Sequence, residues 1–264
     1  MFAANPFEHV MDSKYWEITH NLGFNIPFGL TKYTVLMLLA AVVVLLIYVP
    51  LARRAQSGEP PRGYWWNCFE SLLTYLRDNI AKPCIGHDAD HYVHYIWTVF
   101  LFILFCNLFG MIPFLGSPTA CFAVTTGLAA CTFVFIHGSA IAKMGVGHYF
   151  QSYLPHIDVP FGMGYVIVPM IAGIEFVGNF IKAFVLAVRL FANMFAGHTV
   201  LAFILFFIVA VKNSGPLMFW GVTGASVLGV TALSLLELFV AFLQAYVFTF
   251  LTALFLGATM HPQH

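Results

Sequence analysis

The sequence predicts an all-α integral membrane protein that crosses the bilayer several times. Of its 264 residues, 61% are hydrophobic and only 8% are charged, whereas soluble proteins have about 45–50% apolar and about 25% charged residues. Several apolar stretches reach the ~20 residues that span a bilayer core ~30 Å thick. A water-soluble fold is therefore excluded. The net charge is zero and the sequence has no basic run, so nothing indicates a nucleic-acid partner.

Three of the apolar stretches have the length of a single span, and two are much longer. The single spans cover about 33–51, 92–114 and 120–142. The longer stretches, 165–211 and 217–257, would form helices of roughly 70 and 60 Å at a rise of 1.5 Å per residue. Neither contains a charged loop or a Pro-Gly pair midway. We therefore expect two continuous helices that form a strongly tilted hairpin with a protein partner along one side.

The segment between the first two spans predicts an amphipathic helix. Aromatic and aliphatic residues at helical spacing give residues 62–82 one apolar face, which is typical of a helix at a membrane interface. Lys and Arg are concentrated in the first and third connections, so the positive-inside rule predicts five crossings, with the N-terminus outside and the C-terminus cytoplasmic. Residues 1–32 lack signal-peptide features and are expected to form a retained external segment. The chain, 1–264, is thus predicted to be a single membrane domain, with two central spans in 92–142 and the hairpin in 165–257.

The long apolar stretches contain ionisable residues besides histidine, namely Glu175, Lys182, Arg189 and Glu237. A charge inside a bilayer costs at least ~2.5–3.5 kcal/mol even on a lenient scale, so each of them is a candidate functional residue. At 100° per residue, one polar stripe follows the first long helix and contains Glu175, Asn179, Lys182, Arg189 and Asn193. His198 lies roughly 180° around that helix from Arg189 and is expected to face a different neighbour.

The final helix carries a second polar stripe, consisting of Thr231, Ser234, Glu237, Ala241 and Gln244. The two polar faces are expected to meet each other or a third body. Buried carboxylic acids and histidine can gain and lose protons near pH 7, whereas arginine stays charged. The pattern therefore suggests proton carriers around a fixed cation at Arg189. A static network of ion pairs between helices is the alternative.

The motif VRLFANMFAGH, residues 188–198, resembles the signature of subunit a of F-type ATP synthases. Further segments resemble the same family, namely NPFEHVMD (5–12), NLFGMIP (107–113), SPTACFAVTTGLA (117–129) and LELFVAFLQAYVFTFLTALFLGA (236–258). The resemblance covers essentially the whole chain. It implies a stator subunit whose tilted hairpin embraces a rotating ring of c subunits and which also has the peripheral-stalk b subunits as partners. It implies no cofactor, and the chain lacks the GxxxxGK[ST] run of a nucleotide site.

The resemblance also implies roles for individual residues. Arg189 matches the family's essential arginine, which faces the proton-binding carboxylates of the ring and separates two offset half-channels. His198 and Glu237 match a coupled polar pair in the outer half-channel, and in some bacterial relatives the acid and the histidine occupy these positions in the opposite order. Asn193 and Gln244 match residues close to the ring contact.

The inner half-channel is represented by Glu175, which matches an acid of the family, with Asn179 and Lys182 on the same face. The implied function is proton translocation that rotates the ring and drives ATP synthesis in a distant catalytic head. A bacterial plasma membrane is the expected location, and a mitochondrial or plastid inner membrane is the alternative.

Other histidines suggest other chemistry. His87, His91 and His94 have the i, i+4, i+7 spacing of a metal site, although solvated interfacial histidines near acids are the more common explanation. A membrane haem protein would use His137 and His198 as paired ligands. A self-contained ion transporter is a further alternative, disfavoured by the lack of an internal repeat.

Overall fold

Every regular element in the described part of the chain is a helix. The computed structural model describes residues 32–57, 63–112, 116–152, 164–211 and 215–260. The main helices are α2 (Lys32–Ser57), α3 (Tyr64–Leu76), α5 (Ala89–Gly110), α6 (Phe122–Met144), α7 (Val146–Ser152), α8 (Gly164–Ala210) and α9 (Pro216–Met260). Short helical segments connect some of them, namely η1 (Arg77–Ala81), α4 (Lys82–Ile85), η2 (Gly86–Asp88) and η3 (Pro118–Ala120). Apart from Lys32, the predicted external segment 1–32 lies outside the described residues.

Within the described residues, 5 helical stretches are long and apolar enough to cross a membrane. They are Lys32–Arg53, Tyr64–Gly110, Phe122–Met144, Met170–Ala210 and Pro216–Met260. The prediction of an α-helical protein with several spans is therefore confirmed. The orientation of the termini and the tilt of the helices relative to a bilayer stay predictions.

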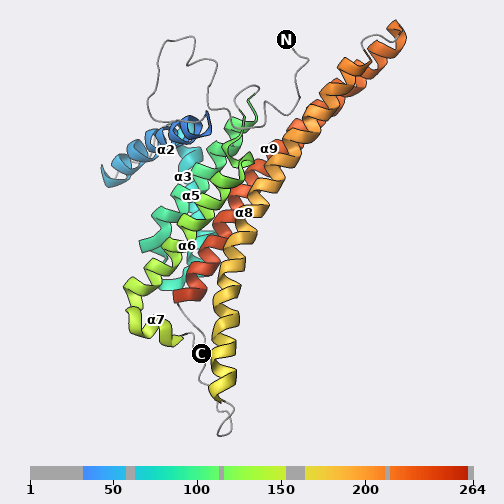
Figure 1. Cartoon of the computed structure of the whole chain (residues 1–264). Coiled ribbons are helices and arrows are strands. Elements are labelled where there is room, and N and C mark those ends of the chain that lie inside the picture. Colours follow the sequence, from blue (N-terminus) through green and yellow to red (C-terminus); the bar gives the residue numbers. More distant parts are fainter. Residues whose placement is uncertain (1–31, 58–62, 113–115, 153–163, 212–214, 261–264) are drawn as a thin grey trace, which may run out of the picture.

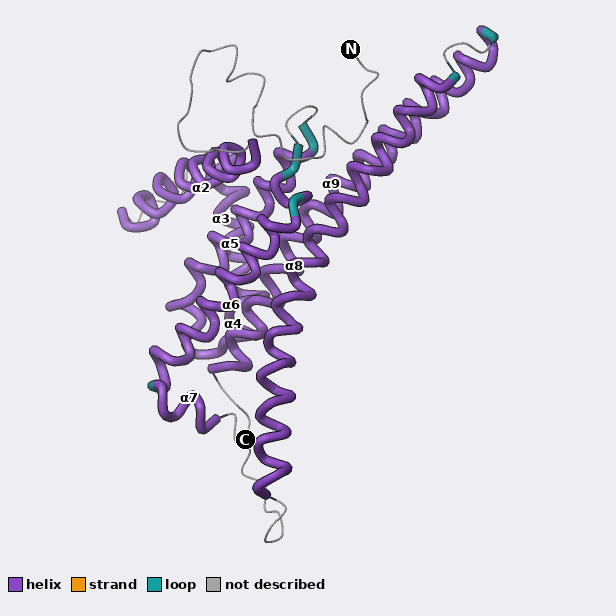
Figure 2. The backbone as a smooth tube through the Cα atoms, in the orientation of Figure 1, coloured by secondary structure: helices purple, strands orange, loops and turns teal. Residues whose placement is uncertain are grey.

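The two longest helices, α8 and α9, form an arm that projects beyond the other helices. They contain 47 and 45 residues, and each is continuous, as the absence of midway loop signals predicts. Figures 1 and 2 show them running side by side in opposite directions, with α8 bending about halfway along. The lower part of the arm packs against α5 and α6, whereas its upper end extends away from them.

The amphipathic segment 62–82 has a contact that the sequence did not predict. The helical stretch from Tyr64 to Ile85 packs lengthwise against α5 and α9, and the chain reverses direction at Gly86, where a φ of 77° suits glycine. The reversal is supported by a hydrogen bond from Trp97 Nε1 to the Leu73 carbonyl, 2.8 Å, and by an Arg77–Asp90 ion pair of 2.7 Å. From Leu73 to Ile85 the apolar face is thus covered by neighbouring helices, whereas Trp65 near its start is 74% exposed. The location of this segment at a membrane surface stays a prediction.

Small residues bring α9 into close contact with its neighbours. Ala241, Ala245 and Ala253 are fully buried on α9, and Gly257 follows one turn later. A Cβ atom placed on Gly257 would lie 1.9 Å from the carbonyl oxygen of Cys84 in α4. The two backbones therefore touch at a point where no side chain fits.

We expect Gly257→Ala to destabilise the protein because α4 and α9 would have to separate. Overpacking of this kind costs typically about 1–3 kcal/mol, which would appear as a lower midpoint of thermal unfolding in detergent. Gly127→Ala is the matched control, because this helical glycine has no atom within 4 Å of the added Cβ. An equal loss of stability in both variants would contradict the close contact.

Candidate functional site

Arg189 lies on the outer face of α8 and has no partner in the described part of the chain. Its side chain is exposed, and it makes no hydrogen bond or ion pair with any described residue. The opposite face of the same helix turn is buried, with Leu186, Leu190 and Met194 packed inside. The helix therefore directs an arginine away from its own protein within an apolar span. Since an isolated charge inside a bilayer is costly, this position calls for an external partner.

One turn further along, α8 is joined to α9 by a pair of amides. Asn193 Nδ2 donates a hydrogen bond to Gln244 Oε1 at 3.0 Å. Gln244 is buried, while the Asn193 side chain is exposed on the same side of the helix as Arg189. The two predicted polar stripes therefore meet here, next to the unpartnered arginine.

His198 and Glu237 form a second contact between α8 and α9. His198 Nδ1 and Glu237 Oε1 are 3.5 Å apart, and the two side chains are largely buried. Glu237 Oε1 and His198 Nε2 have no hydrogen-bond partner in the described structure. Buried polar atoms normally have partners, so this pair has unused capacity to exchange a proton or to bind water.

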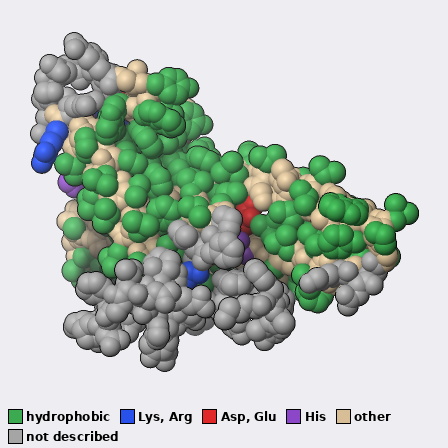
Figure 3. Space-filling view, turned by 90° about the horizontal axis from the view of Figure 1, so that it is seen from above, with side chains coloured by type: hydrophobic (Ala, Val, Ile, Leu, Met, Phe, Trp, Pro, Cys, Tyr) green, Lys and Arg blue, Asp and Glu red, His purple; other side chains and the backbone are tan. Residues whose placement is uncertain are grey.

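Gly197 makes room for this pair. A Cβ atom at position 197 would lie 2.8 Å from Glu237 Oε1. The absence of a side chain there allows the carboxylate to sit directly against the α8 backbone. In the view from above, acidic and histidine side chains are adjacent where the arm meets the rest of the molecule (Figure 3). The surrounding described surface is mainly hydrophobic.

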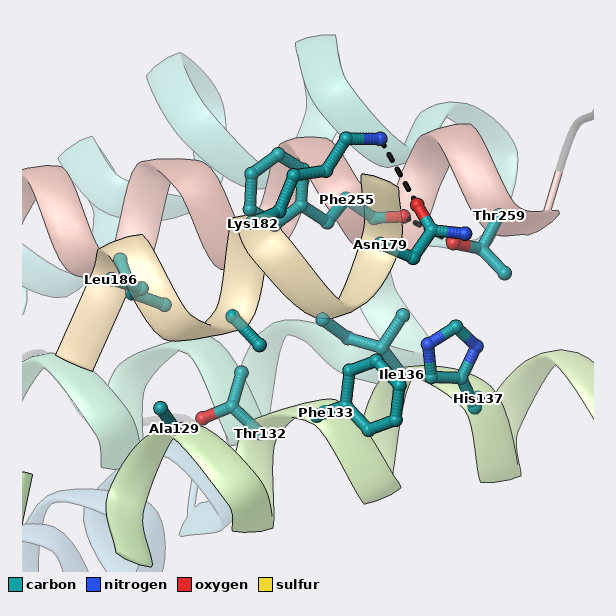
Figure 4. A pocket seen from close by; sticks show the side chains of 11 residues that line it. Ala129, Thr132, Phe133, Ile136, His137, Asn179, Lys182, Leu186, Phe255 and Thr259 are labelled. Atoms are coloured by element: carbon teal, nitrogen blue, oxygen red, sulfur yellow. Dashed lines mark hydrogen bonds between the residues drawn. The ribbon is translucent and has the colours of Figure 1, made fainter. Parts of the chain in front are cut away.

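Lys182 and Asn179 lie on α8 on the other side of Arg189. Lys182 Nζ donates a hydrogen bond to Asn179 Oδ1 at 3.0 Å and lies 5.5 Å from the centre of the Phe255 ring. Both residues line a cavity between α6, α8 and α9 (Figure 4). Glu175 lies one turn before Asn179, is partly buried and is not among the residues that line the cavity.

The candidate residues therefore form two polar groups with Arg189 between them. Lys182 lies seven residues before Arg189 and His198 nine residues after it, or about 10 and 14 Å along the helix axis. Because α8 and α9 are antiparallel, Glu237 and Gln244 belong to the His198 side. The arrangement is a row of polar groups interrupted by a fixed positive charge.

The other candidate sites do not assemble. His94 bonds the Tyr48 hydroxyl through Nδ1 at 2.5 Å, and His91 lies edge-on to Tyr92, 4.8 Å between ring centres. Within the described residues, no three metal-binding side chains converge on one point, at His87, His91 and His94 or elsewhere. The haem alternative requires His137 and His198 to face one iron, but His137 lies at the cavity beside Lys182, and His198 is sixteen residues, about 24 Å, further along α8.

The second polar stripe needs a correction. Thr231 is exposed and its hydroxyl bonds the Val227 carbonyl of its own helix, so it does not face α8. Thr223, whose hydroxyl is buried without a partner, and Ser226, which is buried, continue the inner face of α9 instead. At 100° per residue, Thr231 lies about 120° around the helix from Glu237, whereas Thr223 and Ser226 lie within about 40° of it.

A buried hydrogen-bond network beside the site was not predicted. Asn107 on α5 donates to the Ala241 carbonyl on α9 at 3.3 Å, and Thr119 donates to Asn107 Oδ1 at 2.7 Å. The hydroxyls of Ser117 and Thr119 are 2.7 Å apart. The network connects α5 and the η3 segment to the turn of α9 between Glu237 and Gln244. Asn107 and Ser117 lie in the segments NLFGMIP and SPTACFAVTTGLA, which resemble the family, and this was the only feature of the sequence that pointed to them.

The fold and the site define a multi-spanning α-helical membrane protein with ionisable groups inside its spans. The family model described as ATP synthase A chain matches residues 34–257. The chain therefore belongs to the ATP synthase A chain family, and the resemblance seen in the sequence is confirmed.

Curated bacterial relatives support this assignment. The chain is 40% identical to ATP synthase subunit a of Anaeromyxobacter dehalogenans (strain 2CP-C), over 92% of this chain and 62% of the relative. It is 39% identical to ATP synthase subunit a of Myxococcus xanthus (strain DK1622), over 89% and 74%. It is 40% identical to ATP synthase subunit a 2 of Chlorobaculum tepidum, over 90% and 65%. The chain thus spans about two thirds of the length of these relatives.

Proposed function

We propose that the protein is the proton-translocating stator subunit of an ATP synthase membrane sector. Two offset half-channels would open toward opposite sides of the membrane and meet a rotating ring of c subunits along the exposed face of α8. The exposed, unpartnered Arg189 is the observation that carries this proposal. The partner that fits best is a carboxyl group on a neighbouring protein. That group would move past Arg189, where it is ionised, and would be protonated and neutral while it faces lipid.

The outer half-channel is assigned to His198 and Glu237, with Asn193 and Gln244 at the ring. A proton that enters from the outside would pass between the buried carboxylate and the histidine to a carboxylate of the ring. Both side chains suit this transfer because each gains and loses a proton and each has an atom without a hydrogen-bond partner.

The inner half-channel is assigned to Glu175, with Asn179 and Lys182 on the same face. After almost a full turn of the ring, the proton would leave on this side toward the cytoplasm. Arg189 would then stabilise the emptied carboxylate and prevent direct passage between the half-channels, because arginine keeps its own proton. Each charge that crosses 100 mV releases ~2.3 kcal/mol for rotation.

The partners of the chain follow from this assignment. They are the c-ring, the peripheral-stalk b subunits and the lipid bilayer, in the plasma membrane of a bacterium. The catalytic head, which makes ATP, would be formed by other subunits.

Cross-linking tests the position of the ring. Ala192 is exposed on the Arg189 side of α8, whereas Ala187 is buried on the opposite side. In the assembled complex, Ala192→Cys is expected to form a disulfide with a cysteine placed beside the ring carboxylate, and Ala187→Cys is expected not to. Proton transport by this chain reconstituted alone, or equal cross-linking from both positions, would contradict the proposal.

A further inference from the structure

The cavity beside Lys182 contains a histidine that the proposed half-channels do not use. Its volume is about 20 Å³, and its polar lining residues are Thr132 and His137 of α6, Asn179 and Lys182 of α8, and Thr259 of α9. One water molecule needs about 10–15 Å³ and two to four polar partners. The cavity therefore has the size and the polar groups to hold a water molecule in direct contact with the α8 polar stripe.

The ring of His137 is held in one orientation. Its Nδ1 lies 2.6 Å from the hydroxyl of Tyr149, a residue of α7 that is only 6% exposed. Phe133 packs against the ring, with 4.1 Å between the two ring centres. Figure 4 shows the imidazole directed into the same space as Asn179 and Thr259. With Nδ1 engaged by Tyr149, Nε2 is the nitrogen left for the cavity.

The cavity lies near the end of the molecule that is predicted to be cytoplasmic. His137 is seven residues before the end of α6, and Thr259 is one residue before the end of α9. Figure 1 shows these helix ends on the same side of the molecule as α7. A group at this place would stand between the cytoplasm and the Asn179–Lys182 part of α8.

We propose that His137 is a proton-exchanging residue of the inner half-channel and that Tyr149 is its positioning residue. This inference rests on the proposed function and adds two residues to it. The Tyr149 hydroxyl oxygen accepts a hydrogen bond from Nδ1–H, which leaves the Nε2 lone pair facing the cavity. Nε2 takes a proton from cavity water to form imidazolium and later returns it to water on the cytoplasmic side, so that Nδ1 keeps its proton throughout.

The described surroundings of His137 offer no carboxylate to retain a bound proton. Among the described residues, the titratable groups that face it are Tyr149 from α7 and Lys182 from α8, and the α9 wall contributes the uncharged Phe255 and Thr259. The α6 residues lining the cavity near it are also uncharged. No described carboxylate lines the cavity to hold the imidazolium in place. The proton is therefore released again.

The test uses the complete ATP synthase in inverted membrane vesicles, so that the outer medium sets the pH at the cytoplasmic side. ATP-driven proton pumping is measured across a range of medium pH. We expect His137→Gln, which keeps a polar side chain but cannot exchange a proton, to lower the rate about fivefold and to flatten its dependence on medium pH. His137→Leu should do the same. Tyr149→Phe should lower the rate about twofold and shift the pH profile, since it removes only the group that fixes the tautomer.

Tyr48→Phe is the matched control. Tyr48 and His94 form the same kind of tyrosine–histidine bond, 2.5 Å long, between α2 and α5 and away from the cavity. We expect wild-type pumping from this variant after correction for the amount of assembled complex. Wild-type rates and pH profiles in His137→Gln, or the same change in Tyr48→Phe, would overturn the inference. If Arg189→Ala abolishes pumping in the same vesicles while His137→Gln does not, only the role of His137 fails.

Discussion

Replacing Arg189 with alanine is expected to abolish proton-driven ATP synthesis while the complex still assembles. Arg189 is exposed and makes no hydrogen bond or ion pair with the described residues, so its removal breaks no internal contact. It also removes an intramembrane charge that costs at least ~2.5–3.5 kcal/mol. Function should therefore be lost without a loss of stability, because nothing would then separate the two half-channels. ATP synthesis and passive proton leak are measured in proteoliposomes with an imposed proton gradient.

Two further variants sharpen this test. Arg189→Lys keeps a cation but lacks the planar guanidinium and can lose its proton, so we expect little synthesis from it. Arg53→Ala removes another exposed arginine, near the end of α2, and should leave synthesis unchanged. Normal synthesis by Arg189→Ala would rule out the proposed mechanism.

The second large effect is expected from Glu237. Glu237→Gln keeps the size and shape of the side chain but cannot release a proton, so proton entry from the outside should slow on the order of a hundredfold. His198→Ala should also slow it, with a changed dependence on the pH outside. The measurement is the initial rate of gradient-driven ATP synthesis at a series of outside pH values. Unchanged rates and pH profiles in both variants would argue against a proton relay here.

An exchange of the two residues provides the control. The atoms of His198 and Glu237 are 3.5 Å apart, so the effects of the two changes should not be additive. We expect the double variant His198→Glu with Glu237→His to recover part of the activity lost in each single variant, with a shifted pH profile. If the double variant recovers no activity, the acid must be on α9 and the histidine on α8 for proton transfer to occur.

The sequence predicts those parts of the fold that depend on the order of apolar and polar residues within one helix. Hydropathy and the lack of midway breaks are properties of the chain itself, and they predict the continuous helices α8 and α9 correctly. Helical phase placed Arg189 on a polar stripe, and in the structure its side chain is exposed on α8. Burial cost made it one of four candidate residues, and the motif around it suggested its role.

The parts that the sequence did not predict depend on which surfaces meet. Residues 62–82 have an apolar face, but the pattern does not tell whether lipid or another helix covers it. In the structure, α5 and α9 cover the part from Leu73 onward. In the buried network, Asn107 bonds Thr119, 12 positions later in the sequence. Asn107 also bonds the Ala241 carbonyl of α9, 134 positions later. Tyr149 becomes relevant only because α7 folds back onto α6. Tertiary contacts of this kind have no periodic signature in one sequence.

The arm of α8 and α9 has a mechanical consequence. It is fixed along its lower part, while its upper end extends past the neighbouring helices like a beam clamped at one end. A sideways force on the outer face of the arm therefore produces a torque on the part that is packed against α5 and α6. There, Ala241, Ala245 and Gly257 place backbone against neighbouring helices with little side chain between them. Such contacts yield very little under load, so a force on the arm is transmitted to the neighbouring helices.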